Sequence, residues 1–144
     1  VKDVDYGFVG DVDEVNAEFL GKLSGEGVVP VMAPLTHDKQ GHLLNTNADT
    51  MAATVAKALT EEFDVTLTYC FEKPGVMADA EDDDSVIPSI NTESYARLKA
   101  DGIVSGGMIP KLDNAFDSIS SGVKRVVITH FMDIQASMGT VIEK

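Results

Sequence analysis

Apolar residues recur every three or four positions in four stretches of the chain, and this spacing predicts four helices. The clearest stretch begins at Asp49 and is rich in alanine, the residue with the highest helix propensity. Gly122 follows the last stretch, as is typical of a helix end. The predicted helices cover residues 16–24, residues 49–59, a segment around Tyr95 and Leu98 that ends near Gly102, and residues 108–121.

Short runs of β-branched and aromatic residues separate these helices and predict strands. Pro30 lies in the first run and lacks an N–H group, which favours the edge of a sheet or the start of a strand. Asp38 and Gly41 occupy the first and fourth positions of a type I turn, which predicts a hairpin. The predicted strands cover residues 28–33, residues 42–44 as the return arm of the hairpin, and residues 65–70, 125–129 and 139–142.

The alternation of strands and helices predicts an α/β fold, with a largely parallel sheet sandwiched by helices. A chain of 144 residues is long enough for one domain that buries about two-thirds of its extended-chain surface. Hydrophobic residues make up 44% and charged residues 24% of the chain, as in ordinary globular proteins. We therefore expect a single domain over residues 1–144.

The net charge of -13 disfavours partners that need a basic surface, so we expect neither nucleic acid nor a membrane as a partner. No apolar run reaches the length of a membrane span, and Val1–Asp5 does not have the features of a signal peptide. Cys70 is the single cysteine and cannot form an internal disulfide, which favours a cytoplasmic location. The chain does not begin with Met, which fits a piece of a longer protein.

Two polar motifs, each at a predicted helix start, carry the candidate chemistry. Asn45, Asn47 and Asp49 offer two amides and a carboxylate, although Asn47 or Asp49 could simply cap the helix. Gly106 and Gly107 let the backbone approach a ligand closely, and the N–H groups of the following helix favour an anion. Lys111 lies about one turn into that helix and can reach a phosphoryl group; the alternative is a solvated surface lysine. Ligands of open α/β sheets bind at such strand-to-helix loops.

The remaining reactive residues favour structural roles. His37, His42 and His130 lack the spacing of metal ligands, so we expect no metal site formed by side chains. Cys70 ends a predicted strand and is expected in the core. The acidic run 79–84 is expected to form a solvated loop rather than a cation site. Neither a Walker A sequence nor a G-x-G-x-x-G fingerprint occurs.

Four motifs, in order and with suitable spacing, resemble those of the acetylglutamate kinases, a family within the amino acid kinase superfamily. The resemblance covers essentially the whole chain but matches only the C-terminal half of that family. It implies the C-terminal, nucleotide-binding lobe of a carbamate kinase-like fold, without the N-terminal lobe that holds most of the acylglutamate pocket and a second catalytic lysine. The motifs are Asp5–Val12, Pro30–Pro34, Asn45–Asp49 and Gly106–Lys111.

The resemblance also implies roles for individual residues. Asn45 matches the asparagine that contacts the acylated glutamate, and Asn47 lies beside it in the motif that faces the active centre. Asp49 matches the carboxylate that orients the catalytic lysines, and Lys111 matches the lysine that stabilises the transferring phosphoryl group. Glu72 departs from the pattern, because many family members have Asp there. The implied nucleotide contacts are Glu72, Lys73, Pro74, Gly75, Val76, Met77, Ile103, Val104, Ser105, Gly106 and Gly107.

The implied reaction transfers the γ-phosphoryl group of ATP to the side-chain carboxylate of N-acetyl-L-glutamate or another N-acylglutamate, in arginine biosynthesis. Mg²⁺ would be bound through the nucleotide. The implied partners are the missing N-terminal lobe and, for the full-length protein, further copies in a homo-oligomer, so we expect the 144-residue chain alone to be inactive. Two alternatives stay open: another kinase of the superfamily, acting on glutamate, aspartate, carbamate or UMP, and a non-catalytic nucleotide-binding regulatory module.

Overall fold

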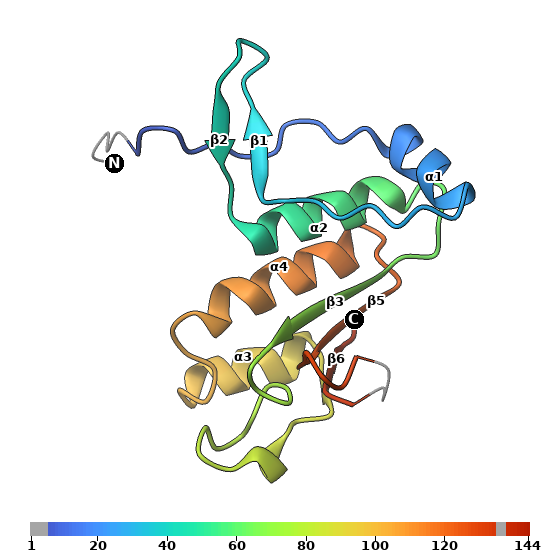
Figure 1. The fold of residues 1–144 in the computed structure, drawn as a ribbon. Coiled ribbons are helices and arrows are strands. Elements are labelled where there is room, and N and C mark those ends of the chain that lie inside the picture. Colours follow the sequence, from blue (N-terminus) through green and yellow to red (C-terminus); the bar gives the residue numbers. More distant parts are fainter. Residues whose placement is uncertain (1–5, 135–137) are drawn as a thin grey trace.

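A four-stranded sheet forms the centre of the computed structural model, which describes residues 6–134 and 138–144 (Figure 1). The strand order is β3-β5-β6-β4, with β3 parallel to β5, β4 parallel to β6, and β5 antiparallel to β6. The α/β class and the mostly parallel sheet are therefore confirmed. The strands are β3 (Thr66–Phe71), β4 (Ser89–Ile90), β5 (Arg125–His130) and β6 (Thr140–Ile142).

Four helices lie at the predicted positions, each within a few residues of its expected ends. Helix α2 packs against β3, and helix α4 packs against α2, β5 and β6. Tyr95 of α3 stacks on Phe116 of α4, with ring centroids 5.0 Å apart. No helix in the described part of the chain is long and apolar enough to cross a membrane. The helices are α1 (Ala17–Gly25), α2 (Ala48–Leu59), α3 (Thr92–Ala100) and α4 (Met108–Ser120).

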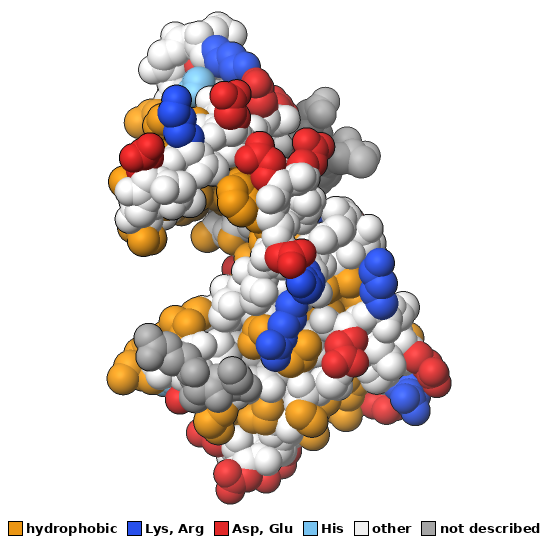
Figure 2. Space-filling view, turned by 90° about the vertical axis from the view of Figure 1, so that its right-hand side faces the viewer, with side chains coloured by type: hydrophobic (Ala, Val, Ile, Leu, Met, Phe, Trp, Pro, Cys, Tyr) orange, Lys and Arg blue, Asp and Glu red, His pale blue; other side chains and the backbone are white. Residues whose placement is uncertain are grey.

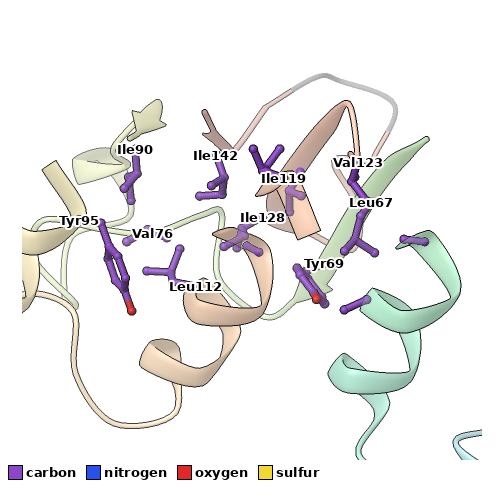
Figure 3. Close-up of a cluster of buried hydrophobic side chains, with 14 of the residues drawn as sticks. Leu67, Tyr69, Val76, Ile90, Tyr95, Leu112, Ile119, Val123, Ile128 and Ile142 are labelled. Carbon is purple, nitrogen blue, oxygen red and sulfur yellow. The ribbon is translucent and has the colours of Figure 1, made fainter. Parts of the chain in front are cut away.

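The core lies between this sheet and helices α2 and α4 (Figure 3). Leu67 and Tyr69 of β3 are buried beside Val126 and Ile128 of β5, which are their partners in the parallel register. Each fully buried aliphatic side chain contributes about 1.5–3 kcal/mol of transfer free energy, so this paired row holds β3 firmly in place. The carboxyl end of β3 is thereby fixed below the two helices.

Cys70 points to the opposite side of the sheet and is exposed. Successive side chains of a strand alternate between faces, and Tyr69 takes the buried face. The prediction that Cys70 lies in the core is therefore wrong. The sequence predicts the strand but does not show which of its alternate side chains face the core.

A two-stranded hairpin lies above this core and consists of β1 (Leu35–His37) and β2 (Leu43–Asn45). Its turn is closed by Asp38, whose Oδ1 accepts hydrogen bonds from the backbone N–H groups of Gln40 (2.7 Å) and His42 (3.1 Å). The His42 ring contacts the other carboxylate oxygen at 2.6 Å, and these contacts lower the pKa of Asp38 to about 2. The predicted hairpin and its return arm are confirmed. The prediction of a type I turn is wrong, because Lys39 at its second position has a φ of +61°, whereas a type I turn needs about −60° there.

Residues 28–33 do not form the predicted strand. Val29 and Val31 are 83% and 94% exposed, and the described residues offer this segment no neighbouring strand. Pro30 and Pro34 remove two backbone donors, which makes pairing harder still. Asp5 of the first motif and the segment Val1–Asp5 lie outside the described residues.

Candidate functional site

Helices α2 and α4 lie side by side and run in the same direction, so their N-termini lie on the same side of the molecule (Figure 1). Two ion pairs define this arrangement. Lys111 pairs with Asp49 near the N-termini, and Lys57 pairs with Asp117 farther along both helices. Because a helix N-terminus carries a partial positive charge, two adjacent N-termini favour an anion between or in front of them.

The ion pair between Lys111 and Asp49 is the centre of the candidate site. Lys111 Nζ lies 2.6 Å from Asp49 Oδ2, a short charge-assisted hydrogen bond. The side chains are 17% and 37% exposed respectively, so the pair is partly shielded from water yet remains accessible. The structure thus brings together two residues that are 62 positions apart in sequence and that the motifs single out separately.

Tyr69 contacts both members of this pair, and the sequence motifs do not include it. Its hydroxyl donates a hydrogen bond to the backbone carbonyl oxygen of Asp49 at 3.3 Å, and Lys111 Nζ lies 5.1 Å from the centre of its ring. Burial and the nearby negative charge of Asp49 raise the pKa of Tyr69 to about 12. The alternation of side chains along β3 could have indicated Tyr69, because it places Tyr69 on the face that the helices cover, near the end of the strand.

The two asparagines have different surroundings. Asn47 caps α2: its Oδ1 accepts a hydrogen bond from the backbone N–H of Thr50 at 3.0 Å. The helix-cap interpretation is therefore confirmed for Asn47, whereas Asp49 lies inside the first turn. Asn45 is exposed at the end of β2, and its backbone N–H and C=O bond to Phe8 O (2.8 Å) and Gly10 N (3.0 Å). The Asn47 side chain is therefore engaged in the helix cap, whereas the Asn45 side chain makes no capping hydrogen bond.

Thr46 lies between these asparagines and is buried, which sequence analysis did not anticipate. Its hydroxyl donates to Gly10 O at 3.0 Å and lies 3.0 Å from Thr36 Oγ1, and its backbone N–H donates to Pro34 O at 3.0 Å. These bonds tie the hairpin, the N-terminal segment and the start of α2 together at one residue. No local sequence signal marks a threonine for such a role.

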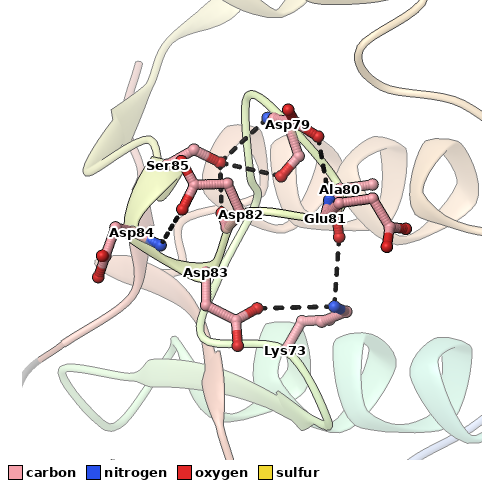
Figure 4. A network of polar contacts seen from close by, with 8 residues as sticks. All are labelled: Lys73, Asp79, Ala80, Glu81, Asp82, Asp83, Asp84 and Ser85. Atoms are coloured by element: carbon pink, nitrogen blue, oxygen red, sulfur yellow. Dashed lines mark hydrogen bonds and ion pairs between the residues drawn. The ribbon is translucent and has the colours of Figure 1, made fainter.

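The loop after β3 begins with two exposed residues, Glu72 and Lys73. Lys73 Nζ donates to Ala80 O at 3.3 Å and lies 3.6 Å from Asp83 Oδ1, so it closes the acidic segment (Figure 4). The carboxylates and hydroxyl of that segment accept or donate hydrogen bonds within it, including the bonds around the short helix η1 (Asp83–Ser85). The prediction of a solvated loop over residues 79–84 is confirmed by their exposure.

Within the same loop, Gly75 and Val76 are buried, whereas Pro74 and Met77 are half-buried. The Val76 backbone N–H donates to Thr140 Oγ1 at 2.8 Å, which anchors the loop to β6. Of the predicted nucleotide contacts in this loop, Glu72 and Lys73 are the most accessible, while the Val76 side chain belongs to the core.

Replacement of Gly75 by alanine is expected to destabilise the fold by about 1–3 kcal/mol. An added Cβ would lie 2.8 Å from Thr140 Oγ1 and 2.9 Å from Val86 Cγ1, too close for either to stay in place. Gly25→Ala is the matched control, since nothing lies within 4 Å of its Cβ position, and it should leave stability unchanged or raise it by up to about 1 kcal/mol. Urea denaturation measures both, and equal midpoints for the two variants would contradict the packing argument.

The second predicted nucleotide loop leads into α4. Val104 is buried and anchors it, whereas Ile103, Ser105, Gly106 and Gly107 are exposed. No atom lies within 4 Å of a Cβ position on Gly106 or Gly107, so the space in front of this helix start is open. Gly106 has a φ of +53°, a conformation that suits glycine. Figure 1 shows this loop and the end of β3 on the same side as the N-termini of α2 and α4.

The histidines do not gather into a metal site. His42 contacts Asp38, and His130 lies 3.8 Å from Asp133. Among residues 6–134 and 138–144, no three His, Cys, Asp or Glu side chains come together in a way that could hold a metal ion.

Comparisons with known proteins show the family of this chain. A model of the amino acid kinase family matches residues 1–130. An acetylglutamate kinase of Phocaeicola vulgatus is 62% identical over 144 residues, which are 100% of this chain and 56% of that protein. An acetylglutamate kinase of Bacteroides thetaiotaomicron is 60% identical over the same shares of both chains. The chain thus spans about half the length of the curated relatives it matches.

Solved structures show the same fold. The N-acetylglutamate synthase of Neisseria gonorrhoeae, complexed with coenzyme A and L-arginine, matches with a TM-score of 0.85 and 19% identity, over 100% of this chain and 34% of that one. The carbamate kinase of Giardia lamblia bound to AMP-PNP matches with a TM-score of 0.65 and 18% identity, over 92% and 50% of the two chains. At these identities the likeness shows the fold alone.

Proposed function

Because this chain belongs to the amino acid kinase family, we propose that it is the nucleotide-binding lobe of a kinase that phosphorylates the side-chain carboxylate of an N-acylglutamate. The observation that carries the proposal is the Lys111–Asp49 pair at the adjoining N-termini of α2 and α4. The two curated relatives described above, both named acetylglutamate kinase, support N-acetylglutamate as the acceptor.

In the proposed reaction, a carboxylate oxygen of the acceptor attacks the γ-phosphorus of ATP. A new P–O bond forms, the bond to the bridging β,γ-oxygen breaks, and ADP leaves with that oxygen and its electron pair. The carboxylate is already ionised at neutral pH, so the step needs no general base. The products are an acyl phosphate and ADP.

The protein's part in this reaction is positioning and charge. Lys111 would place its ammonium group against the equatorial oxygens of the transferring phosphoryl group, where negative charge accumulates. Asp49 would orient that ammonium group, since the two side chains already form a 2.6 Å contact. Asn45 would contact the acceptor from the end of β2. Mg²⁺ carried by the nucleotide would neutralise charge on the β- and γ-phosphates when bound.

Nucleotide binding is proposed for the two loops that converge on this side of the molecule. The open space before Gly106 and Gly107 and the paired helix N-termini suit phosphates. Glu72 and Lys73 are exposed and polar at the end of β3, and they are the residues of their loop most able to contact a ribose or base.

An N-terminal lobe as partner is supported by the apolar surface of residues 6–45. Tyr6, Phe8, Val29 and Val31 are all more than half exposed. A hollow of about 910 Å³ lies between the N-terminal segment, α1, the hairpin and α2. Figure 2 shows apolar side chains on either side of a notch in the molecular outline. Exposed apolar area of this kind is typical of an interface with another part of a protein. A cytoplasmic location, arginine biosynthesis and a full-length homo-oligomer complete the proposal.

The test is phosphoryl transfer by a full-length protein that contains this sequence. ADP release measures turnover with every acceptor, and hydroxylamine traps any acyl phosphate formed. Turnover is expected to be fastest with an N-acylglutamate in a panel that also holds glutamate, aspartate, carbamate and UMP. Fastest turnover with one of these would assign the chain to another branch of the superfamily. No turnover with any acceptor, together with retained nucleotide binding, would favour a regulatory module. The 144-residue chain alone is the control and should show no turnover.

A further inference from the structure

One buried residue, Tyr69, contacts both members of the Lys111–Asp49 pair from the sheet side. Tyr69 is only 4% exposed and lies on β3, where Ile128 of β5 is its partner in the parallel register. The ring faces Lys111 Nζ at 5.1 Å, and the hydroxyl holds the Asp49 carbonyl oxygen at 3.3 Å. Three elements, β3, α2 and α4, therefore meet at this one side chain.

A lysine needs such a support more than most charged residues do. Its ammonium group is a compact charge at the end of a flexible four-carbon chain, and one carboxylate fixes the distance but not the direction of that charge. An aromatic face adds a second attraction, since a cation within about 6 Å of the ring centre interacts with its negative face. A leucine at the same place could fill the core but would offer neither this face nor a hydrogen-bond donor.

We propose that Tyr69 is a positioning residue for phosphoryl transfer, with its ring face fixing the direction of the Lys111 ammonium group and its hydroxyl fixing the turn that carries Asp49. This inference rests on the proposed function, because it assigns a role in the same reaction. Tyr69 touches no substrate in this role and acts only through its two partners.

The electrostatics of the site agree with this role. Burial and the Asp49 charge raise the pKa of the Tyr69 phenol to about 12, so the ring stays neutral. A phenolate would compete with the phosphoryl oxygens for the Lys111 charge, whereas a neutral ring attracts the ammonium group and leaves its donors free for the nucleotide.

The kinetic test compares Tyr69→Phe and Tyr69→Leu in the full-length protein. Tyr69→Phe keeps the aromatic face and loses only the 3.3 Å hydrogen bond to the Asp49 carbonyl oxygen, so it should lower kcat by no more than about threefold. Tyr69→Leu loses both contacts and should lower kcat by about tenfold. The KM values for ATP and acceptor should change little in either variant, because the lost contacts only orient Lys111, whose charge is needed as the phosphoryl group transfers. Leu67→Ala is the matched control: it removes packing from the same face of β3, so it should lower the melting temperature without lowering kcat.

A second measurement tests the geometry without any activity. In NMR spectra of the full-length protein, the ε-methylene protons of Lys111 should show an upfield ring-current shift. Tyr69→Phe should keep this shift and Tyr69→Leu should abolish it. Absence of the shift in the wild type would overturn the inference.

The kinetic outcomes separate the inference from the function on which it rests. Wild-type kcat in Tyr69→Leu, or an equal loss of kcat in Leu67→Ala, would overturn the role of Tyr69 and leave the kinase proposal standing. A wild-type protein without turnover on any acceptor would overturn both.

Discussion

Lys111→Met is expected to lower kcat of the full-length protein by about a hundredfold to a thousandfold, or about 3–4 kcal/mol in the barrier. Methionine keeps the unbranched apolar stem but carries no charge. The charge is needed only as negative charge accumulates on the transferring phosphoryl group, so the loss should fall on kcat more than on KM. Steady-state kinetics at saturating ATP measures it.

Lys57→Met provides the matched control for this variant. Lys57 joins the same two helices through Asp117, farther from their N-termini. Its loss should cost about as much stability and leave kcat unchanged. Near-normal turnover in Lys111→Met, or an equal fall in both variants, would contradict the role assigned to Lys111.

Asp49→Asn is expected to lower kcat by about tenfold to a hundredfold, which is less than the loss of the lysine itself. The amide has nearly the shape of the carboxylate but no charge, so the ammonium group of Lys111 would lose its fixed counter-charge, and the Lys111 side chain is only 17% exposed. The double variant with Lys111→Met should be no slower than Lys111→Met alone, because Asp49 acts through that lysine. Measurement of kcat for the wild type, both single variants and the double variant gives the coupling.

Asp117→Asn is the control for the carboxylate, since it weakens the second ion pair between the same helices. It should leave kcat unchanged. Full additivity of the Asp49 and Lys111 effects would show that Asp49 acts independently, and would contradict its assignment as the residue that orients the lysine.

Local signals explain why so much of the fold could be predicted from the sequence. Helix α2 begins where Asn47 supplies a cap, and the turn at Asp38 forms bonds within four residues. Such features depend on neighbours in the chain, and they appear where they were expected. The pairing of Lys111 with Asp49 was reached from the resemblance, since no local pattern links residues 62 positions apart.

Features that depend on distant partners could not be predicted in this way. Residues 28–33 have the composition of a strand, but composition does not reveal whether a neighbouring strand is present. Strand β4 is two residues long, too short for an alternation of apolar and polar residues to be recognised. The role of Tyr69 depends on the phase of β3 and on two helices that reach it from elsewhere.

The buried Thr46 has a mechanical consequence for the acceptor side of the site. Asn45 is bonded to the N-terminal segment through Phe8 and Gly10, while Asn47 caps α2 and Asp49 lies in its first turn, so Thr46 alone separates the two asparagines. Thr46 is hydrogen-bonded to Gly10, Thr36 and Pro34, so it does not act as a flexible linker. We therefore expect a shift of the hairpin to displace the first turn of α2 as well, because no flexible linker lies between them. In the proposed reaction, the residues that would contact the acceptor and the phosphate groups therefore belong to connected parts of the chain, joined at Thr46.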